Sequence, residues 1–108
     1  MNGSFEIQEY IENGRSPYAE WLDGLDAVTA ARVEKYVLRL EHGNFGVAKF
    51  LCDGVFELRL DFGPGYRVYF GREGRAIIIL LGGGSKRRQD ADIAAAVERW
   101  KRYKQTKQ

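Results

Sequence analysis

The 108-residue sequence is poor in the side chains that form disulfides, metal centres and histidine-based catalytic sites. Cys52 is the only cysteine, which excludes an internal disulfide and a multi-cysteine zinc site. His42 is the only histidine, so no pair of histidines can hold a metal, and no Ser-His-Asp or Cys-His arrangement is visible around it. We therefore expect neither a metal nor a cofactor.

Long apolar runs are also missing. The longest apolar stretch extends from Ala76 to Leu81, which is far shorter than the roughly 20 residues of a membrane span. The N-terminal stretch MNGSFEIQEY lacks the basic start and apolar segment of a signal peptide. With 44% hydrophobic and 30% charged residues, the composition is globular. These features predict one cytoplasmic domain over residues 1–108, with a frayed tail from about residue 104 and no membrane contact.

Charge is distributed unevenly along the chain. Residues 1–56 contain 5 Lys and Arg against 9 Asp and Glu, whereas residues 57–108 contain 12 against 6. The C-terminal half is therefore the natural surface for a polyanion such as RNA, although basic residues also favour solubility at strand edges and in terminal helices.

Hydrophobic periodicity predicts the order of the elements. A first strand covers Phe5–Gln8, and two helices follow, with Ser16 and Asp26 as caps and Pro17 at the first helical position. Four strands with short links then predict an antiparallel run, and a helix closes the chain. We expect these segments at residues 16–24 and 26–42 for the two helices, 47–52, 55–62, 66–70 and 75–81 for the strands, and 92–104 for the closing helix.

The fold class that this order predicts is α+β. We expect an antiparallel sheet of four to five strands, with the two N-terminal helices on one face and a C-terminal helix, all helices covering the same side. Alternation sends Phe56, Leu58, Tyr66 and Val68 to the core.

The strand faces opposite the apolar ones carry the candidate functional side chains. Arg59 and Glu57 lie on one predicted strand, and Arg67 and Tyr69 lie on the next. If these faces coincide, the two guanidiniums form a phosphate-binding patch, and Tyr69 can stack on a base or donate its hydroxyl. The alternative is a cross-strand ion pair in which Glu57 or Asp61 neutralises Arg67.

A second basic signal is the stretch GGGSKRR, residues 82–88. Three glycines allow a ligand to approach the backbone closely, and Lys86, Arg87 and Arg88 add positive charge before the closing helix. The spacing does not match a Walker motif. Phosphate contact is favoured here over a flexible, solvated link.

These residues together resemble a known family. The stretch VFELRLDFGPGYRVYFGREGRAIIILLGGGSKRRQDADIAAA and the earlier SPYAEWLDGLD are similar to the RelE/ParE superfamily of bacterial toxins. The similarity is to the HigB-like branch of addiction-module killer proteins. Its most specific parts are residues 57–59, residues 65–69 and the apolar strand that ends in glycines before Lys86. The order and spacing of these parts are more specific than any one of them.

The resemblance implies a compact α+β toxin of a type II toxin–antitoxin module. Such a protein cleaves mRNA, commonly on the ribosome and without a metal, and is neutralised by a cognate antitoxin that we expect to be of the helix-turn-helix type. Arg67 matches the arginine implicated in phosphate stabilisation, and Lys86 and Arg87 match basic residues after the last strand. In this reading Arg67, Lys86 and Glu57 are catalytic, whereas Arg59, Tyr69, Arg87 and Arg88 bind RNA.

The sequence departs from many relatives in one respect. They carry a histidine or tyrosine near the end of the sheet or in the last helix, and residues 82–85 contain neither. Glu57 is then the best carboxylate of the patch for proton removal. This departure keeps a second function open, namely a ParE-like inhibitor of DNA gyrase that cleaves nothing.

Overall fold

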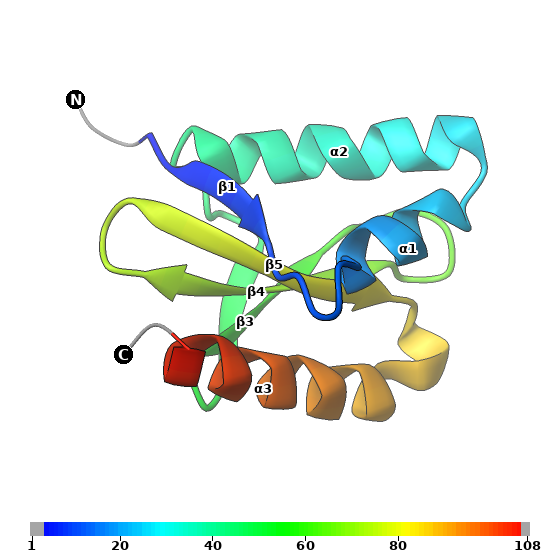
Figure 1. Cartoon of the computed structure of the whole chain (residues 1–108). Helices are drawn as coiled ribbons and strands as arrows, with labels where there is room; N and C mark the ends of the chain where they lie inside the picture. Colours follow the sequence, from blue (N-terminus) through cyan, green and yellow to red (C-terminus); the bar gives the residue numbers. More distant parts are fainter. Residues whose placement is uncertain (1–3, 107–108) are drawn as a thin grey trace.

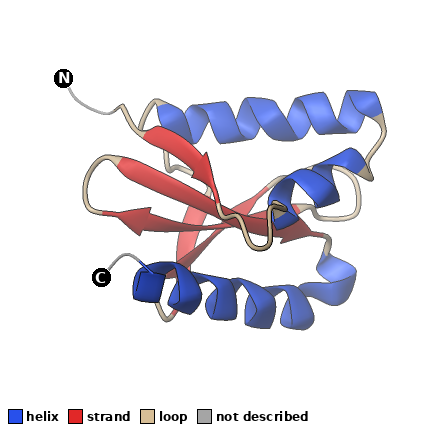
Figure 2. Cartoon of the chain, viewed as in Figure 1, coloured by secondary structure: helices blue, strands red, loops and turns tan. Residues whose placement is uncertain are grey.

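The computed structural model of the chain describes residues 4–106 and places a five-stranded sheet between helices (Figures 1 and 2). The elements of this described part are, in chain order, β1 (Glu6–Glu9), α1 (Pro17–Asp23), α2 (Ala27–Glu41), β2 (Ala48–Cys52), β3 (Val55–Arg59), β4 (Arg67–Glu73), β5 (Ile77–Gly84), a 3-10 turn η1 (Lys86–Arg88) and α3 (Gln89–Thr106).

The sheet has the strand order β1-β5-β4-β3-β2. Strands β2 to β5 pair antiparallel with their neighbours in sequence, whereas β1 pairs parallel with β5. The predicted α+β fold is confirmed, and the antiparallel run is confirmed for β2 to β5. The parallel first strand makes the sheet mixed, because apolar alternation reports which face a strand buries but not the direction in which it pairs.

The helices cover both faces of the sheet. Helices α1 and α2 pack on one face, where Ile78 and Leu80 of β5 contribute to the core. Helix α3 packs on the other, against Ile79 and Leu81 (Figure 1). The expectation that all helices share one face was therefore wrong. A strand that is apolar on both sides, as β5 is, must be covered on both sides.

Local sequence signals for turns and caps are confirmed. The Ser16 side chain accepts a hydrogen bond from the Ala19 amide at 3.0 Å, and the Asp26 side chain accepts one from the Thr29 amide at 3.1 Å. Asp53 and Gly54, between β2 and β3, both have positive φ, 51° and 86°. This is the conformation that a two-residue hairpin turn requires.

Several boundaries differ from the predicted ones. Strand β3 ends at Arg59 rather than Phe62, and β5 continues through the three glycines instead of ending before them. Helix α3 extends to Thr106, so residues 104–106 of the predicted frayed tail are helical, and residues 107–108 lie outside the described part. No helix within residues 4–106 is both long and apolar enough to cross a membrane.

Candidate functional site

The strand register brings the predicted site residues to one end of the sheet. Arg59 of β3 lies opposite Arg67 of β4, and Arg67 lies opposite Gly84 of β5. Glu57 lies opposite Tyr69 in the same way. The prediction that these faces coincide is confirmed, and the shared face is the one that α3 covers.

Burial separates the two arginines. Arg67 is 3% exposed and Glu57 1% exposed, whereas Arg59 is exposed. The Arg67 Nε lies 3.5 Å from Glu57 Oε1, and Arg67 Nη1 donates a hydrogen bond to the Gly65 carbonyl at 2.7 Å. Gln89, at the start of α3, donates to Glu57 Oε1 at 3.2 Å. The structure therefore has the cross-strand ion pair that the sequence left as an alternative to a solvent-facing phosphate patch.

Tyr69 is enclosed with this pair. Its ring has no exposed surface, so no RNA base can stack on it in this structure, and the predicted stacking role does not fit. Burial raises the pKa of the Tyr69 hydroxyl; Glu57 and Asp92 raise it further and Arg67 opposes them. Within the described residues the Tyr69 hydroxyl and the Arg67 Nε have no hydrogen-bond partner, although the latter contacts Glu57.

The other predicted cations remain at the surface. Lys86, Arg87 and Arg88, which we call the basic ridge, are exposed and follow β5 directly. The ridge lines a shallow hollow together with the first residues of α3. No ion pair within residues 4–106 neutralises the ridge or Arg59. These four side chains are thus the part of the predicted site that a polyanion can reach.

The glycine run has a packing role that sequence reasoning missed. A Cβ at Gly83 would lie 2.2 Å from the ring of Trp21, and a Cβ at Gly84 would lie 2.0 Å from the carboxylate of Asp92. At Gly82 it would lie 2.7 Å from the guanidinium of Arg99. Each glycine therefore makes room for a side chain of α1 or α3, and the expected phosphate-binding glycine loop is instead the last part of β5.

Asp92 is the residue at this end that no sequence motif pointed to. Its carboxylate lies over Gly84, the strand partner of Arg67, and makes no hydrogen bond or ion pair within the described part of the chain. Burial raises the pKa of the Asp92 carboxyl, and Arg88 and Arg99 offset part of this rise. A partly buried carboxyl with a raised pKa in a cleft is suited to proton transfer. Asp92 also lines a cleft between α1 and α3.

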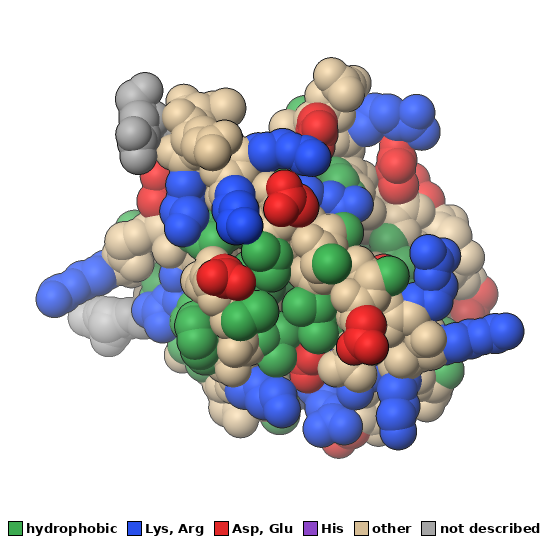
Figure 3. All heavy atoms as spheres, turned by 90° about the horizontal axis from the view of Figure 1, so that it is seen from below, with side chains coloured by type: hydrophobic (Ala, Val, Ile, Leu, Met, Phe, Trp, Pro, Cys, Tyr) green, Lys and Arg blue, Asp and Glu red, His purple; other side chains and the backbone are tan. Residues whose placement is uncertain are grey.

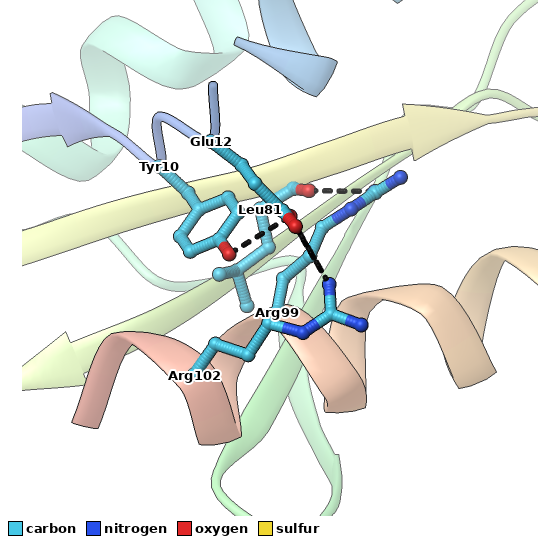
Figure 4. A network of polar contacts seen from close by, with 5 residues as sticks. All are labelled: Tyr10, Glu12, Leu81, Arg99 and Arg102. Atoms are coloured by element: carbon cyan, nitrogen blue, oxygen red, sulfur yellow. Dashed lines mark hydrogen bonds and ion pairs between the residues drawn. The ribbon is translucent and has the colours of Figure 1, made fainter. Parts of the chain in front are cut away.

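Polar contacts fasten α3 over the site (Figure 4). Arg99 donates to the Leu81 carbonyl of β5 at 2.9 Å, and Arg102 donates to Glu12 at 3.0 Å. Tyr10 donates to the same carboxylate at 3.0 Å. These contacts tie α3 both to β5 and to the segment that joins β1 to α1, so the helix is a fixed cover rather than a loose appendage.

Metal ligation is not indicated for residues 4–106, because no group of three or more His, Cys, Asp or Glu side chains is placed to hold an ion. The chain is thus an α+β domain with a mixed sheet covered on both faces and cations exposed at one end.

Over 80 residues, 73% of this chain and 81% of the relative, the chain is 45% identical to an uncharacterized protein of Haemophilus influenzae. This identity and coverage place the chain in the same family as that protein. No protein-family model matches the present chain.

Proposed function

We propose that the chain is the toxin of a type II toxin–antitoxin module, of RelE/ParE type, and that it cleaves mRNA without a metal. One observation carries the proposal: the exposed side chains of the basic ridge and of Arg59, which form no ion pair within residues 4–106, lie at the same end of the sheet as Asp92, a carboxyl with a raised pKa. Exposed cations that form no ion pair attract a phosphate backbone. The resemblance of the sequence to this superfamily supports the same reading.

Cleavage at this site would use the 2′-hydroxyl of the RNA as its nucleophile. The Asp92 carboxylate takes the 2′-hydroxyl proton, and the freed oxygen attacks the adjacent phosphorus. The bond from phosphorus to the 5′-oxygen breaks, and the Lys86 ammonium protonates that oxygen. Arg87 and Arg88 stabilise the charge that develops on the phosphate oxygens. The products are a 2′,3′-cyclic phosphate and a free 5′-hydroxyl.

Arg67 and Glu57 take a different role from the one expected. Because both side chains are buried, neither can contact the RNA. Glu57 forms the ion pair with Arg67, and Arg67 positions the site rather than binding phosphate. It holds the Gly65 carbonyl, and this turn packs against the ridge: the Lys86 amide donates to the Pro64 carbonyl at 3.3 Å. Loss of Arg67 would therefore displace Lys86 indirectly.

RNA binding is the first test. Purified protein is titrated into a fluorescent single-stranded RNA at several salt concentrations. Replacing Lys86 or Arg87 by Ala weakens binding and lowers the slope of log affinity against log salt by about 0.7 for each lost phosphate contact. Arg75→Ala is the matched control, because Arg75 is exposed in the turn between β4 and β5 and lies outside the ridge. Equal effects of all three substitutions would reject a defined RNA surface.

Cleavage is tested in cells by sequencing RNA ends after brief induction. The wild-type chain produces new 5′-hydroxyl ends in mRNA, and Asp92→Asn removes them while the protein stays folded and bound to RNA. New ends that persist in Asp92→Asn would reject Asp92 as the base.

Inhibition of DNA gyrase is the second candidate, and one observation favours it. Burial of Arg67, Glu57 and Tyr69 removes three of the seven predicted site residues from contact with any substrate. Hydrophobic side chains also gather in the middle of the α3 side of the molecule, with Lys and Arg on several sides (Figure 3). A protein target fits such a surface. Induction that yields DNA damage without new RNA ends would favour this function.

In either case we expect the protein to act in the cytoplasm, on the ribosome and its mRNA in the first case. We also expect a cognate antitoxin, of the helix-turn-helix type. A short reading frame of that kind beside this one would support the pairing.

A further inference from the structure

Strand β1 is an edge strand, and no further strand of the described chain pairs with its outer side. The amides of Glu6 and Tyr10 donate to Ala76 and Leu80, next to and within β5, so the amides of alternate residues point away from the sheet. Phe5 is one of these, and its amide donates to the Glu41 carbonyl at the end of α2 at 2.8 Å. By the same alternation, the amides of Ile7 and Glu9 point outward, where the described chain adds no further strand.

A groove of about 210 Å³ lies along this open edge, between β1 and α2. Figure 1 shows β1 lying close below the helix. Ile7, Val37 and Leu80 form an apolar part of the lining, and Leu38 stands beside them with 49% of its surface exposed. Unpaired backbone groups beside apolar side chains are the features that an added strand uses.

The charged residues that line the groove are all carboxylates. Glu9, Glu34 and Glu41 are exposed, and none of them forms an ion pair within residues 4–106. Arg32 and Arg39 of α2 do not neutralise them, because their guanidiniums stack on the rings of Phe62 and Tyr36. Burial raises the pKa of Tyr18 in the groove, and Glu34 and Glu9 raise it further, which places both charges close to the lining.

Spacing defines what would fit. Glu34, Leu38 and Glu41 follow one face of α2, and Glu34 and Glu41 are seven residues apart, about 10 Å along the axis. In an extended strand, positions i and i+4 point to the same side and lie about 13 Å apart. A strand with cations at i and i+4 and an apolar residue at i+2 therefore matches carboxylates on either side of Leu38.

We propose that this groove binds an extended segment of a partner protein that carries a basic, an apolar and a basic residue at alternate positions. The segment pairs with the outward amides of Ile7 and Glu9, places its apolar side chain against Leu38, and sets its cations against Glu34 and Glu41. RNA is repelled by the three carboxylates, and a second copy of β1 would bring the carboxylates of Glu6 and Glu9 close to those of the other copy. The proposal does not rest on the RNA chemistry at the basic ridge.

The probe is a synthetic peptide with the core Thr-Lys-Thr-Val-Thr-Lys-Thr, and the control peptide has Glu in place of both lysines. Binding is followed by NMR, through the chemical shifts and hydrogen exchange of the backbone amides of the whole protein. We expect only the basic peptide to shift and protect the amides of Ile7 and Glu9. Leu38→Lys, or Glu34→Lys with Glu41→Lys, should weaken its binding about tenfold or more, since like charges then meet across the groove.

Val28→Lys is the matched control, because Val28 is also on α2, is 71% exposed and does not line the groove. It should leave the affinity unchanged. The double Glu-to-Lys variant should gain affinity for the acidic peptide. The proposal is overturned if neither amide of β1 responds to the basic peptide, or if Val28→Lys weakens binding as much as Leu38→Lys. Binding of both peptides with equal affinity would overturn it as well.

Discussion

Replacing Arg67 by Ala should destabilise the protein strongly, although arginine is ordinarily a surface residue. The substitution leaves Glu57, 1% exposed, without its cation and removes the hydrogen bond to the Gly65 carbonyl. Among residues 4–106, only the side-chain amide of Gln89 would still donate a hydrogen bond to the Glu57 carboxylate.

The expected cost follows from the burial of both partners. Removing one member of a buried ion pair costs about 3–5 kcal/mol, because a buried charge is left uncompensated. This is a large share of the 5–15 kcal/mol by which a typical domain is stable. With an m-value of about 1.5 kcal/mol/M for urea, a loss of about 3 kcal/mol lowers the unfolding midpoint by about 2 M.

The assay is urea unfolding followed by far-UV circular dichroism, with Arg59→Ala as the matched control. Arg59 is the same residue type directly opposite Arg67, but it is exposed and has no ion pair within residues 4–106. Its replacement should change stability by no more than about 0.5 kcal/mol. The same variant should weaken RNA binding, so stability and binding separate the two arginines.

A double variant provides a second test of the buried ion pair. Replacing both members, Arg67→Met with Glu57→Leu, removes the buried charges together and should recover most of the stability lost in Arg67→Ala. A cost of less than about 1 kcal/mol for Arg67→Ala, the size expected of an exposed pair, would contradict a buried ion pair. A double variant that is no more stable than Arg67→Ala would contradict the buried pair as well.

Three further predictions concern the packing and the charges around this site. Gly83→Ala should destabilise the protein by about 1–3 kcal/mol, because the added Cβ would overlap the Trp21 ring. The control, Gly46→Ala at an exposed position, should be nearly neutral. Urea unfolding midpoints measure both, and equal losses of stability would reject the packing role of Gly83. The native pKa of Asp92 lies above the ordinary value of 3.8, so the stability it contributes is greatest below pH 3.8 and is lost as pH rises through the native pKa. Asp92→Asn should therefore be more stable than the parent at pH 7 and not at pH 3.5, and a constant difference at both would contradict the burial argument. Ser16→Ala should lower the stability of the protein by about 1 kcal/mol, because α1 loses its N-cap hydrogen bond. The loss is measured as a lower midpoint of thermal unfolding, and an unchanged midpoint would show that the cap is dispensable.

Local chemistry in the sequence predicted much of the fold. The capping residues Ser16 and Asp26 mark the starts of two helices, and Asp53-Gly54 marks a hairpin. Alternation assigned the core side of β3 and β4, because side chains in a strand point to opposite faces in turn. The same alternation put Glu57 and Arg59 on one face of β3 and Arg67 and Tyr69 on one face of β4, and the strand register then showed that these two faces coincide.

Long-range packing decided the rest. No local pattern states that β1 pairs parallel with β5, or that α3 covers the face opposite α1 and α2. The burial of Arg67 depends on that placement of α3, and the same placement brings Asp92 over Gly84. A sequence shows that an arginine lies on the face left free by the core, but whether a helix then covers that face is decided by contacts between residues distant in the chain. Alternation in the sequence therefore assigned side chains to one face of each strand, because neighbouring residues of a strand point to opposite sides. Strand pairing and the packing of α3 then brought these faces side by side and decided which side chains are exposed to solvent.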